Sequence, residues 1–279
     1  METVTTVAEL RSIVKQWKKE GKSIGFVPTM GYLHEGHGSL ISRARENDRV
    51  VVSIFVNPMQ FGENEDFSSY PRDFERDCRF CGSLGTDIVF HPDPSEIYAS
   101  DFCTFVDMSR LTENLCGKSR PGHFRGVCTV VAKLLNIVNP DRAYFGEKDA
   151  QQLAVIKRMV RDLNIDVEII GCPIVREHDG LAKSSRNTYL NGDERKAALV
   201  LNKALSYAEM LAKKGVTDPE TITSAMIELI KSEPLAKVDY VKAVNSITME
   251  DIEKINPQTL IAIAVYIGKT RLIDNLIVR

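Results

Sequence analysis

Two histidines three positions apart, His34 and His37, follow an apolar segment that ends in a glycine turn, residues 24–31. Gly31 and Gly36 let a ligand approach the backbone closely, and the free N–H groups at a helix start attract an anion. The order of residues predicts that His37 opens this helix. A histidine placed there can donate to the charge that develops on a phosphate oxygen in the transition state. The pair therefore predicts an enzyme that splits ATP at its α-phosphate.

Metal binding and helix capping are the alternatives for this histidine pair. The metal motif H-E-x-x-H places its histidines four positions apart on one helix face. Here the spacing is three, Gly36 lies between the histidines, and no third ligand is evident. We therefore expect no protein metal site. A pair of surface or capping histidines stays open, because a short H-x-G-H match arises readily by chance.

A second polar cluster, residues 183–187, offers two cations and two hydroxyls within four positions. Lys183 and Arg186 can neutralise phosphate charge, and the hydroxyls of Ser184 and Ser185 can bond non-bridging oxygens. Taken alone, such a segment is more often a solvated loop. Its combination with the histidine pair indicates a phosphate site.

The loop at residues 146–149 follows a predicted strand and begins a helix. Lys148 can reach a phosphate there, and Asp149 suits a helix cap or a ribose hydroxyl. Gln151 and Gln152 come next, about 100° apart around the helix, so at least one of them is expected to face the cleft.

Two more loops carry polar side chains. Asn57 and Gln60 follow another predicted strand, and their amides can orient a hydroxyl or a carboxylate without adding charge. Residues 120–126 combine two arginines, two glycines and a histidine. This segment is either a mobile basic flap or an exposed loop, and we expect it at the edge of the site. Turn and cap chemistry is an equal alternative for the loops after the strands.

These loops need a scaffold that brings distant segments together. Up to about residue 175 helix and strand patterns alternate, with helices predicted over 7–19, 38–47, 72–84, 126–138 and 149–163 and strands over 23–28, 49–56, 87–90, 143–145 and 167–170. Continuous apolar strands between helices predict a Rossmann-like α/β fold, a parallel sheet flanked by helices on both faces. In such sheets ligands bind at the carboxyl ends of the strands, where the loops above are expected.

The pattern changes near residue 190. The later elements are helices over 193–214 and 218–232 and strands over 238–244, 260–267 and 272–278. Residues 268–271 are expected to form a hairpin connection between the last two strands. We therefore predict two domains, a Rossmann-like domain over residues 1–178 and a smaller α+β domain over residues 179–279.

Composition narrows the class of function. A formal net charge of −2, from 36 basic and 38 acidic residues, argues against a broad nucleic-acid-binding face. Residues 1–6 lack a basic region followed by an apolar one, so we expect no signal peptide, and no run of about 18 apolar residues predicts a membrane span. The six cysteines are expected to be reduced, and Cys78 and Cys81 to pack on an apolar helix stripe with Phe74 and Leu84.

Together these motifs resemble the pantothenate synthetase (pantoate–β-alanine ligase) family of the nucleotidyltransferase superfamily, which carries HIGH and KMSKS-type signatures. The similar segments follow the family's order over nearly the whole chain: residues 28–37, 55–61, 120–124, 145–153, 179–187 and 268–275. The resemblance implies a two-step reaction in the cytoplasm. The carboxylate of pantoate attacks the α-phosphate of MgATP, giving pantoyl adenylate and pyrophosphate, and the amine of β-alanine then displaces AMP to give pantothenate.

The resemblance also implies a role for individual residues. His37 is the principal catalytic donor, with His34 beside it on the triphosphate and Lys148 as a third catalytic residue. The implied ATP-binding residues are Met30, Gly31, Tyr32, Leu33, His34, Glu35, Gly36, His37, Gly146, Glu147, Lys148, Asp149, Val175, Lys183, Ser184, Ser185 and Arg186. Gln60, Gln152 and Asn57 are implied at pantoate and β-alanine. Mg²⁺ arrives with ATP, and members of the family are typically homodimers.

The sequence gives a separate structural expectation for each of four further positions. Lys183 stands where many relatives have an apolar residue, so its side chain is not expected to be needed even if its backbone touches ATP. Gly38 is expected to loosen the helix after the histidines. Asp73 and Asp77 are possible metal neighbours, but an exposed helix face is the expected place for them.

Two rival functions stay open. One is a related nucleotidyltransferase that releases pyrophosphate without forming an amide. The other is a non-catalytic nucleotide sensor, which the presence of both histidines, Lys148 and Arg186 disfavours.

Overall fold

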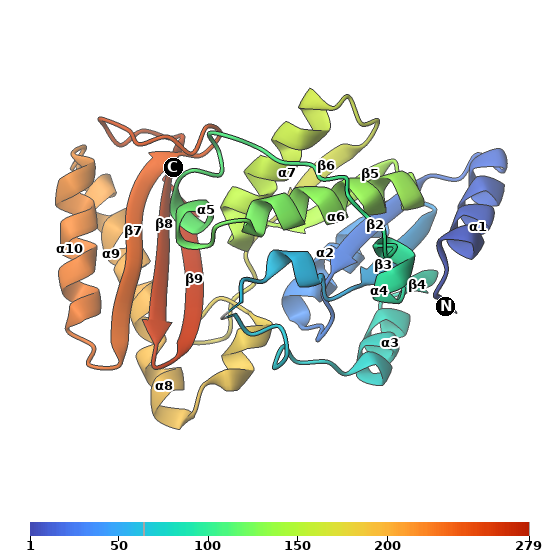
Figure 1. The fold of residues 1–279 in the computed structure, drawn as a ribbon. Coiled ribbons are helices and arrows are strands. Elements are labelled where there is room, and N and C mark those ends of the chain that lie inside the picture. Colours follow the sequence, from blue (N-terminus) through green and yellow to red (C-terminus); the bar gives the residue numbers. More distant parts are fainter. Residues whose placement is uncertain (64, 279) are drawn as a thin grey trace. The chain divides into compact units, whose positions relative to one another are not determined.

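The computed structural model describes residues 1–63 and 65–278 (Figure 1). The chain forms two compact units. The first comprises residues 1–108, 120–147 and 155–173, and the second comprises residues 109–119, 148–154 and the chain from Ile174 onward. The second unit thus gathers two short earlier segments, and the domain boundary at residues 178 and 179 stays a prediction.

The first unit holds a six-stranded sheet in which every pairing is parallel. Its order is β1 (Glu2–Val4), β4 (Ile88–Phe90), β3 (Arg49–Ile54), β2 (Ile24–Thr29), β5 (Arg142–Gly146) and β6 (Glu168–Cys172). The predicted Rossmann-like parallel sheet is confirmed. Strand β1, three residues long at the sheet's edge, was not predicted from the sequence.

Helices cover this sheet between its strands. They are α1 (Val7–Lys19), α2 (Glu35–Ala44), α3 (Phe74–Ser83), α4 (Pro94–Ile97), α6 (His123–Val138) and α7 (Ala150–Asp162). Local signals explain several ends: the Thr6 side chain caps α1, and α6 stops where Asn139 turns left-handed (φ 45°). The division between the units falls inside α7, between Ala154 and Val155.

The core of the first unit forms where α2 and α3 cover the sheet. Val27, Val50 and Val52 are fully buried there, and Cys81 packs among them. Cys78 joins the same cluster, which confirms that the two cysteines serve packing. All six cysteines are free thiols.

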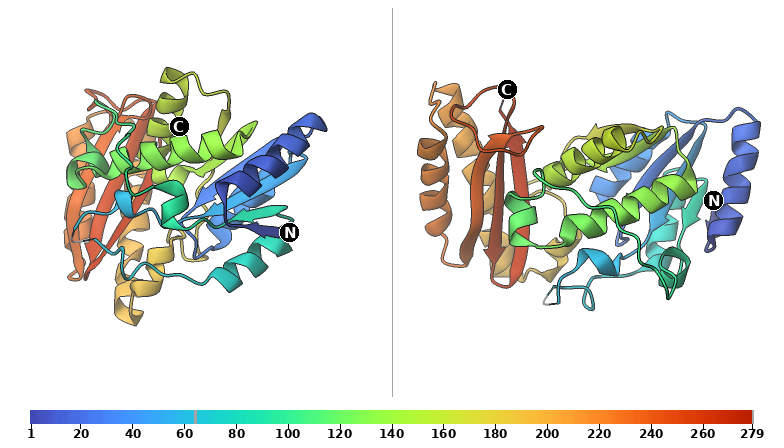
Figure 2. Two further views of the ribbon diagram at one scale, coloured as in Figure 1. Left: turned by 45° about the vertical axis from the view of Figure 1, so that its right-hand side comes forward. Right: turned by 45° about the horizontal axis from the view of Figure 1, so that its top comes forward.

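The second unit contains an antiparallel sheet of β7 (Ala236–Asn245), β8 (Thr259–Ile267) and β9 (Thr270–Ile277). Gly268 and Lys269 join β8 to β9, so the predicted hairpin is confirmed. The helices are α5 (Leu115–Ser119), α8 (Gly192–Ala197), α9 (Leu199–Lys213) and α10 (Pro219–Lys231), of which α9 and α10 cover one face of the sheet (Figures 1 and 2).

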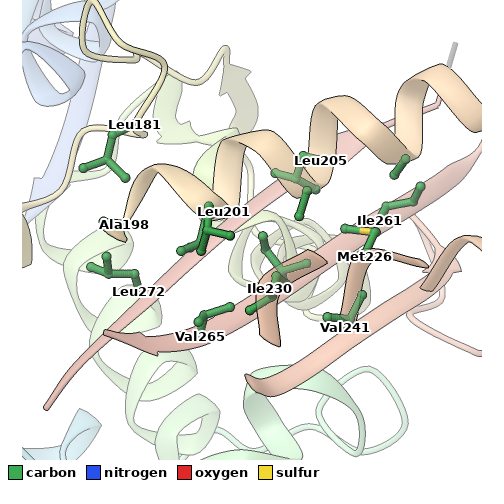
Figure 3. Packing of buried hydrophobic residues seen from close by; sticks show 14 of the residues in the cluster. Leu181, Ala198, Leu201, Leu205, Met226, Ile230, Val241, Ile261, Val265 and Leu272 are labelled. Atoms are coloured by element: carbon green, nitrogen blue, oxygen red, sulfur yellow. The ribbon is translucent and has the colours of Figure 1, made fainter. Parts of the chain in front are cut away.

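Apolar side chains from α9, α10 and the sheet form a second core. Figure 3 shows Leu201 and Leu205 of α9 near Ile230 of α10 and Val265 of β8, all of them buried. The single helix predicted over 193–214 is wrong, because α8 and α9 meet at Ala198. The Ala198 backbone keeps a helical conformation (φ −58°, ψ −22°), so the apolar pattern continues through the junction.

Candidate active site

The loop after β2 begins with two residues in the left-handed region, Gly31 (φ 83°) and Tyr32 (φ 50°). Thr29 ties the loop to the next strand: its hydroxyl donates to the Ser53 carbonyl at 2.8 Å and accepts from the Gly31 N–H at 3.1 Å. Gly31 adopts this conformation without steric strain because it has no Cβ atom, whereas Tyr32 must be held in it by the surrounding structure.

The histidine pair caps helix α2. The Gly36 N–H donates to His34 Nδ1 at 3.1 Å, the His34 N–H donates to His37 Nδ1 at 3.3 Å, and the two ring centroids lie 4.1 Å apart. The prediction that His37 opens the helix is wrong. The helix begins at Glu35 and His37 is its third residue, because the two imidazoles satisfy N–H groups of the first turn. The capping alternative is thereby confirmed.

Capping does not exclude phosphate chemistry, because the two functions use different atoms. A ring nitrogen that accepts a hydrogen bond carries no proton, so a neutral imidazole that accepts through Nδ1 holds its proton on Nε2. In both His34 and His37 the Nε2–H is therefore the donor. Two such donors beside a helix N-terminus suit an anionic ligand.

Gly38 does not loosen the helix. Its N–H donates to the His34 carbonyl at 3.0 Å, and the residue is buried. A Cβ atom at this position would lie 3.0 Å from Phe80 Cζ. The glycine thus allows α3 to pack closely against α2, and the expectation of a looser helix start is wrong.

The two aspartates of α3 have different environments. Asp73 is exposed as expected and caps the helix, since its carboxylate accepts from the Arg76 N–H at 3.1 Å. Asp77 is only 1% exposed, so the expectation of an exposed face is wrong for it. Its position three residues after Phe74 and four before Cys81 places it on the apolar stripe, and this spacing is the signal from which its burial could have been predicted.

The loop after β3 holds the two amides expected at pantoate. It contains the short helix η1 (Pro58–Gln60). The Asn57 Nδ2 donates to Gln60 Oε1 at 3.0 Å and to the Gly126 carbonyl at 3.1 Å, and the Tyr98 hydroxyl donates to Asn57 Oδ1 at 2.9 Å. Asn57 is 1% exposed and orients the Gln60 amide.

Residues 120–126 are tied to the same loop. Arg120 donates to Glu65 at 2.6 Å and to the Gln60 carbonyl at 3.2 Å. His123 Nδ1 lies 2.9 Å from that carbonyl and its Nε2 lies 3.1 Å from an Arg120 nitrogen. Since a guanidinium only donates, Nε2 accepts and Nδ1–H donates to Gln60. The segment expected at the edge of the site thus contacts a predicted substrate residue.

The ion pair changes the titration of Glu65. Burial by itself raises the pKa of a carboxyl, but the hydrogen bond and the charge of Arg120 outweigh it, so the pKa of Glu65 is lowered.

In the second unit, residues 175–183 form a small hairpin. The Lys183 N–H donates to the Val175 carbonyl at 2.9 Å, and the chain turns at Gly180. The following helix η3 (Ser185–Tyr189) is capped by the Ser184 hydroxyl, which accepts from the Arg186 N–H at 3.3 Å. The cluster predicted from the sequence is thus an ordered hairpin and helix start.

Helix η2 (Glu147–Asp149) connects β5 to α7. The Lys148 ammonium lies 3.6 Å from the Asp149 carboxylate, and the Lys148 carbonyl accepts from Asn275 at 2.8 Å. The Gln151 amide is buried and is used within the unit, because it accepts from the Cys116 N–H and donates to the carbonyls of Leu111 and Asn114. Gln152 beside it is half-buried.

The structure thus gathers the predicted residues into two sets. In the first unit, β2, β3 and β5 are parallel neighbours, so their carboxyl ends bring the segment 30–37 to the same sheet edge as Asn57, Gln60, Gly146 and Glu147. The second unit contains Lys148, Asp149, Gln152, Val175 and the segment 183–186.

Two features are absent from the part of the chain that the structure describes. Among residues 1–63 and 65–278, no group of three or more His, Cys, Asp or Glu side chains is placed to hold a metal ion. Over the same residues no helix has the length and apolar character needed to cross a membrane.

Comparisons with known proteins agree along the whole chain. A family model described as Pantoate-beta-alanine ligase matches residues 2–277. The pantothenate synthetase of Ruminiclostridium cellulolyticum is 63% identical over 275 residues, covering 99% of this chain and 98% of that protein. That of Clostridioides difficile is 61% identical over 273 residues, covering 98% and 97%.

Solved structures show the same similarity. The crystal structure of pantothenate synthetase from Thermus thermophilus has a TM-score of 0.94 at 46% identity and 99% coverage of both chains. That of pantoate-beta-alanine ligase from Francisella tularensis, complexed with beta-gamma ATP and beta-alanine, has a TM-score of 0.83 at 38% identity, covering 99% of this chain and 97% of that one. The chain belongs to the pantoate–β-alanine ligase family, whose members are also named pantothenate synthetases.

Proposed function

We propose that this enzyme joins (R)-pantoate to β-alanine with MgATP as co-substrate, through a pantoyl adenylate. In the first step a pantoate carboxylate oxygen forms a bond to the α-phosphorus, and the bond to the bridging oxygen of pyrophosphate breaks. In the second step the amine of β-alanine attacks the acyl carbon, AMP leaves, and the amine loses a proton. Neither step needs a covalent enzyme intermediate, so the protein supplies position and charge stabilisation.

The histidine pair carries this proposal. Both imidazoles accept through Nδ1, so both Nε2–H groups can donate to phosphate oxygens as negative charge develops on them. His37 is the principal donor and His34 acts beside it on the triphosphate. The N-terminus of α2 adds backbone donors, and the segment from Met30 to His37 lines the nucleotide.

Residues of the second unit are also proposed to bind ATP. Lys148 and Arg186 neutralise phosphate charge, and the hydroxyls of Ser184 and Ser185 bond its oxygens. Lys183 contributes mainly its backbone, which is already paired with Val175. Gly146, Glu147 and Asp149 complete the ATP-binding set at the end of β5.

Pantoate is proposed to bind the amides of Gln60 and Gln152, with Gln60 also near the amine of β-alanine. Asn57 acts as the neighbour that orients Gln60, a role that its hydrogen bond to Gln60 Oε1 supports. Mg²⁺ enters as part of MgATP. We also propose that the enzyme is a cytoplasmic homodimer that binds no nucleic acid, in line with its net charge of −2.

Isotope exchange tests the proposed route. With MgATP and pantoate but without amine, labelled pyrophosphate should exchange into ATP, and AMP and pantothenate should accumulate only after β-alanine is added. The absence of exchange would remove the adenylate mechanism. Exchange without amide formation would instead favour the related nucleotidyltransferase.

A further inference from the structure

The carboxylate of Asp77 holds the loop that leads into the histidine pair. Its two oxygens accept from the N–H groups of Tyr32 and Leu33, each at 2.7 Å. These are consecutive residues, and the second directly precedes His34. A buried carboxylate that binds two adjacent backbone donors fixes the position of the chain between them.

This carboxylate forms a long ion pair with Arg76, whose Nη1 lies 3.9 Å from Asp77 Oδ1. Arg76 also donates to the Leu33 carbonyl at 2.9 Å and lies over the Tyr32 ring, 4.9 Å from its centroid. Burial outweighs the two backbone hydrogen bonds and the charge of Arg76, so the pKa of Asp77 is raised. Burying a carboxylate costs stability unless it is hydrogen-bonded or paired, and here the two backbone N–H groups and Arg76 offset that cost.

The held loop is a strained one. Tyr32 has a left-handed backbone that a residue with a side chain rarely adopts, and Gly31 before it shares that conformation. A Cβ on Gly31 would lie 3.1 Å from Asp77 Oδ2 and 3.0 Å from Ile54 Cγ2, so carboxylate, turn and strand β3 are in contact. The fully buried Leu33 side chain anchors the end of the turn.

We propose that Asp77 is a positioning residue for the adenylation step, in which its carboxylate places the backbone of Tyr32 and Leu33 and thereby His34 and His37. This inference rests on the proposed function. Without the two hydrogen bonds the turn can relax, and the Nε2 donors move away from the phosphate oxygens. A displacement of about 1 Å is enough to lower a rate by about two orders of magnitude.

The test is the substitution Asp77→Asn, assayed by pyrophosphate exchange with saturating ATP and pantoate. The variant keeps the shape of the side chain but loses one acceptor oxygen. We expect the exchange kcat to fall about 10- to 30-fold and the KM for ATP to change less than threefold, because the loss is one of orientation. An exchange rate within twofold of the wild type would overturn the proposal.

A double-variant cycle separates positioning from general destabilisation. If Asp77 acts through the histidines, adding Asp77→Asn to His37→Ala should lower the rate less than threefold further. If the rate losses of the two single variants multiply fully in the double variant, Asp77 acts independently of His37 and has a structural role only. Asp73→Ala is the matched control on the same helix: it removes the cap of α3, and the exchange rate should stay within twofold.

Arg76→Met provides a second test if the Asp77→Asn variant folds poorly. Arg76 is exposed, and its substitution removes the bond to the Leu33 carbonyl, the contact with the Tyr32 ring and the long ion pair with Asp77. A threefold to tenfold loss of exchange is expected, and no loss would contradict the proposal. A wild-type enzyme without exchange would refute the proposed function itself, whereas an active wild type with unaffected variants would refute only this inference.

Discussion

The loops after β2 and β3 end neighbouring strands of one sheet, yet a carboxylate supports each in a different way. Asp77 is buried and holds the histidine loop through two backbone N–H groups, and its ion pair with Arg76 is long, at 3.9 Å. Glu65 holds the Gln60 loop indirectly, through its ion pair with Arg120. The pKa of Asp77 is raised because burial dominates, whereas that of Glu65 is lowered because Arg120 outweighs burial.

The difference shows what each loop requires. In the proposed function the histidine loop carries donors whose position must be set to a fraction of an ångström, and short bonds to a buried carboxylate give that rigidity at a cost in stability. The Gln60 loop is proposed to present an amide to a small substrate, for which a partly exposed ion pair is sufficient support. Loss of the first support should therefore lower kcat, and loss of the second should raise the KM for pantoate.

The largest loss of turnover is expected on substitution of the histidine that is proposed as the principal donor, His37. His37→Ala should lower turnover by about two to three orders of magnitude, the size of losing one transition-state donor. His37→Asn separates the two functions of the ring, since its side-chain oxygen can still accept from the His34 N–H while the Nε2 donor is gone. Both variants should lose turnover, but only Ala should also lower the urea midpoint. A near-normal rate in a folded His37→Ala variant would remove His37 from catalysis.

Close packing at the two loops should differ as well. Gly126→Ala should destabilise the enzyme by about 3 kcal/mol, because its Cβ would lie 2.1 Å from the Met59 carbonyl oxygen at η1. Gly38→Ala should cost about 1 kcal/mol, since its Cβ would meet the end of the Phe80 ring at 3.0 Å.

Gly82→Ala in α3 is the control for both glycine variants. Its Cβ would make only ordinary contacts with the end of the Met1 side chain, the nearest at 3.8 Å to Sδ, so the helix propensity of alanine should stabilise the enzyme by about 0.5–1 kcal/mol. Urea unfolding measures all three variants. Equal losses for Gly126 and Gly38 would show that the contact of α6 with η1 and that of α2 with α3 are packed with the same tolerance.

Arg120→Met should raise the KM for pantoate about tenfold while the KM for ATP stays within twofold. The guanidinium bonds to Glu65 and to the Gln60 carbonyl are lost, and a tenfold change corresponds to about 1.4 kcal/mol, which is reasonable for one charge-assisted interaction. Arg120→Lys should restore part of the affinity. A fall in kcat at unchanged KM would mean that both loops serve orientation, and the comparison would fail.

The smallest effect is the pH dependence of stability, which should have opposite signs at the two carboxylates. The lowered pKa of Glu65 stabilises the folded state above the ordinary value of 4.5, and this contribution is lost as the pH falls through the folded pKa. The pKa of Asp77 is raised, so the folded state takes up a proton at a pH above the ordinary value of 3.8. This uptake stabilises the folded state as the pH falls.

Urea unfolding of the wild type, Glu65→Gln and Asp77→Asn between about pH 7 and 3.5 measures both signs. The advantage of the wild type over Glu65→Gln should shrink on acidification, and its stability relative to Asp77→Asn should rise, each by about 1 kcal/mol or less. Parallel curves for the two variants would contradict the assignment of opposite shifts.

Much of the scaffold could be predicted from the sequence, because apolar runs and helical periods are local properties. Five of the six strands of the parallel sheet, all but β1, and the hairpin connection after residue 267 agree with the structure. The predicted start of α2 was wrong by three residues, since a pattern of apolar positions does not show that imidazoles cap the first turn. The break at Ala198 was missed because its backbone stays helical.

By itself the sequence determined most of the order of strands and helices, the family and the residue types of the candidate site. Tertiary structure alone decided which nitrogen of each histidine accepts, and hence which one donates. It also decided that Asp77 supports the turn at Leu33, a contact between residues 44 positions apart. The reason is physical: periodicity records which face of an element is apolar, whereas hydrogen bonds between distant segments exist only once packing has placed their atoms within reach.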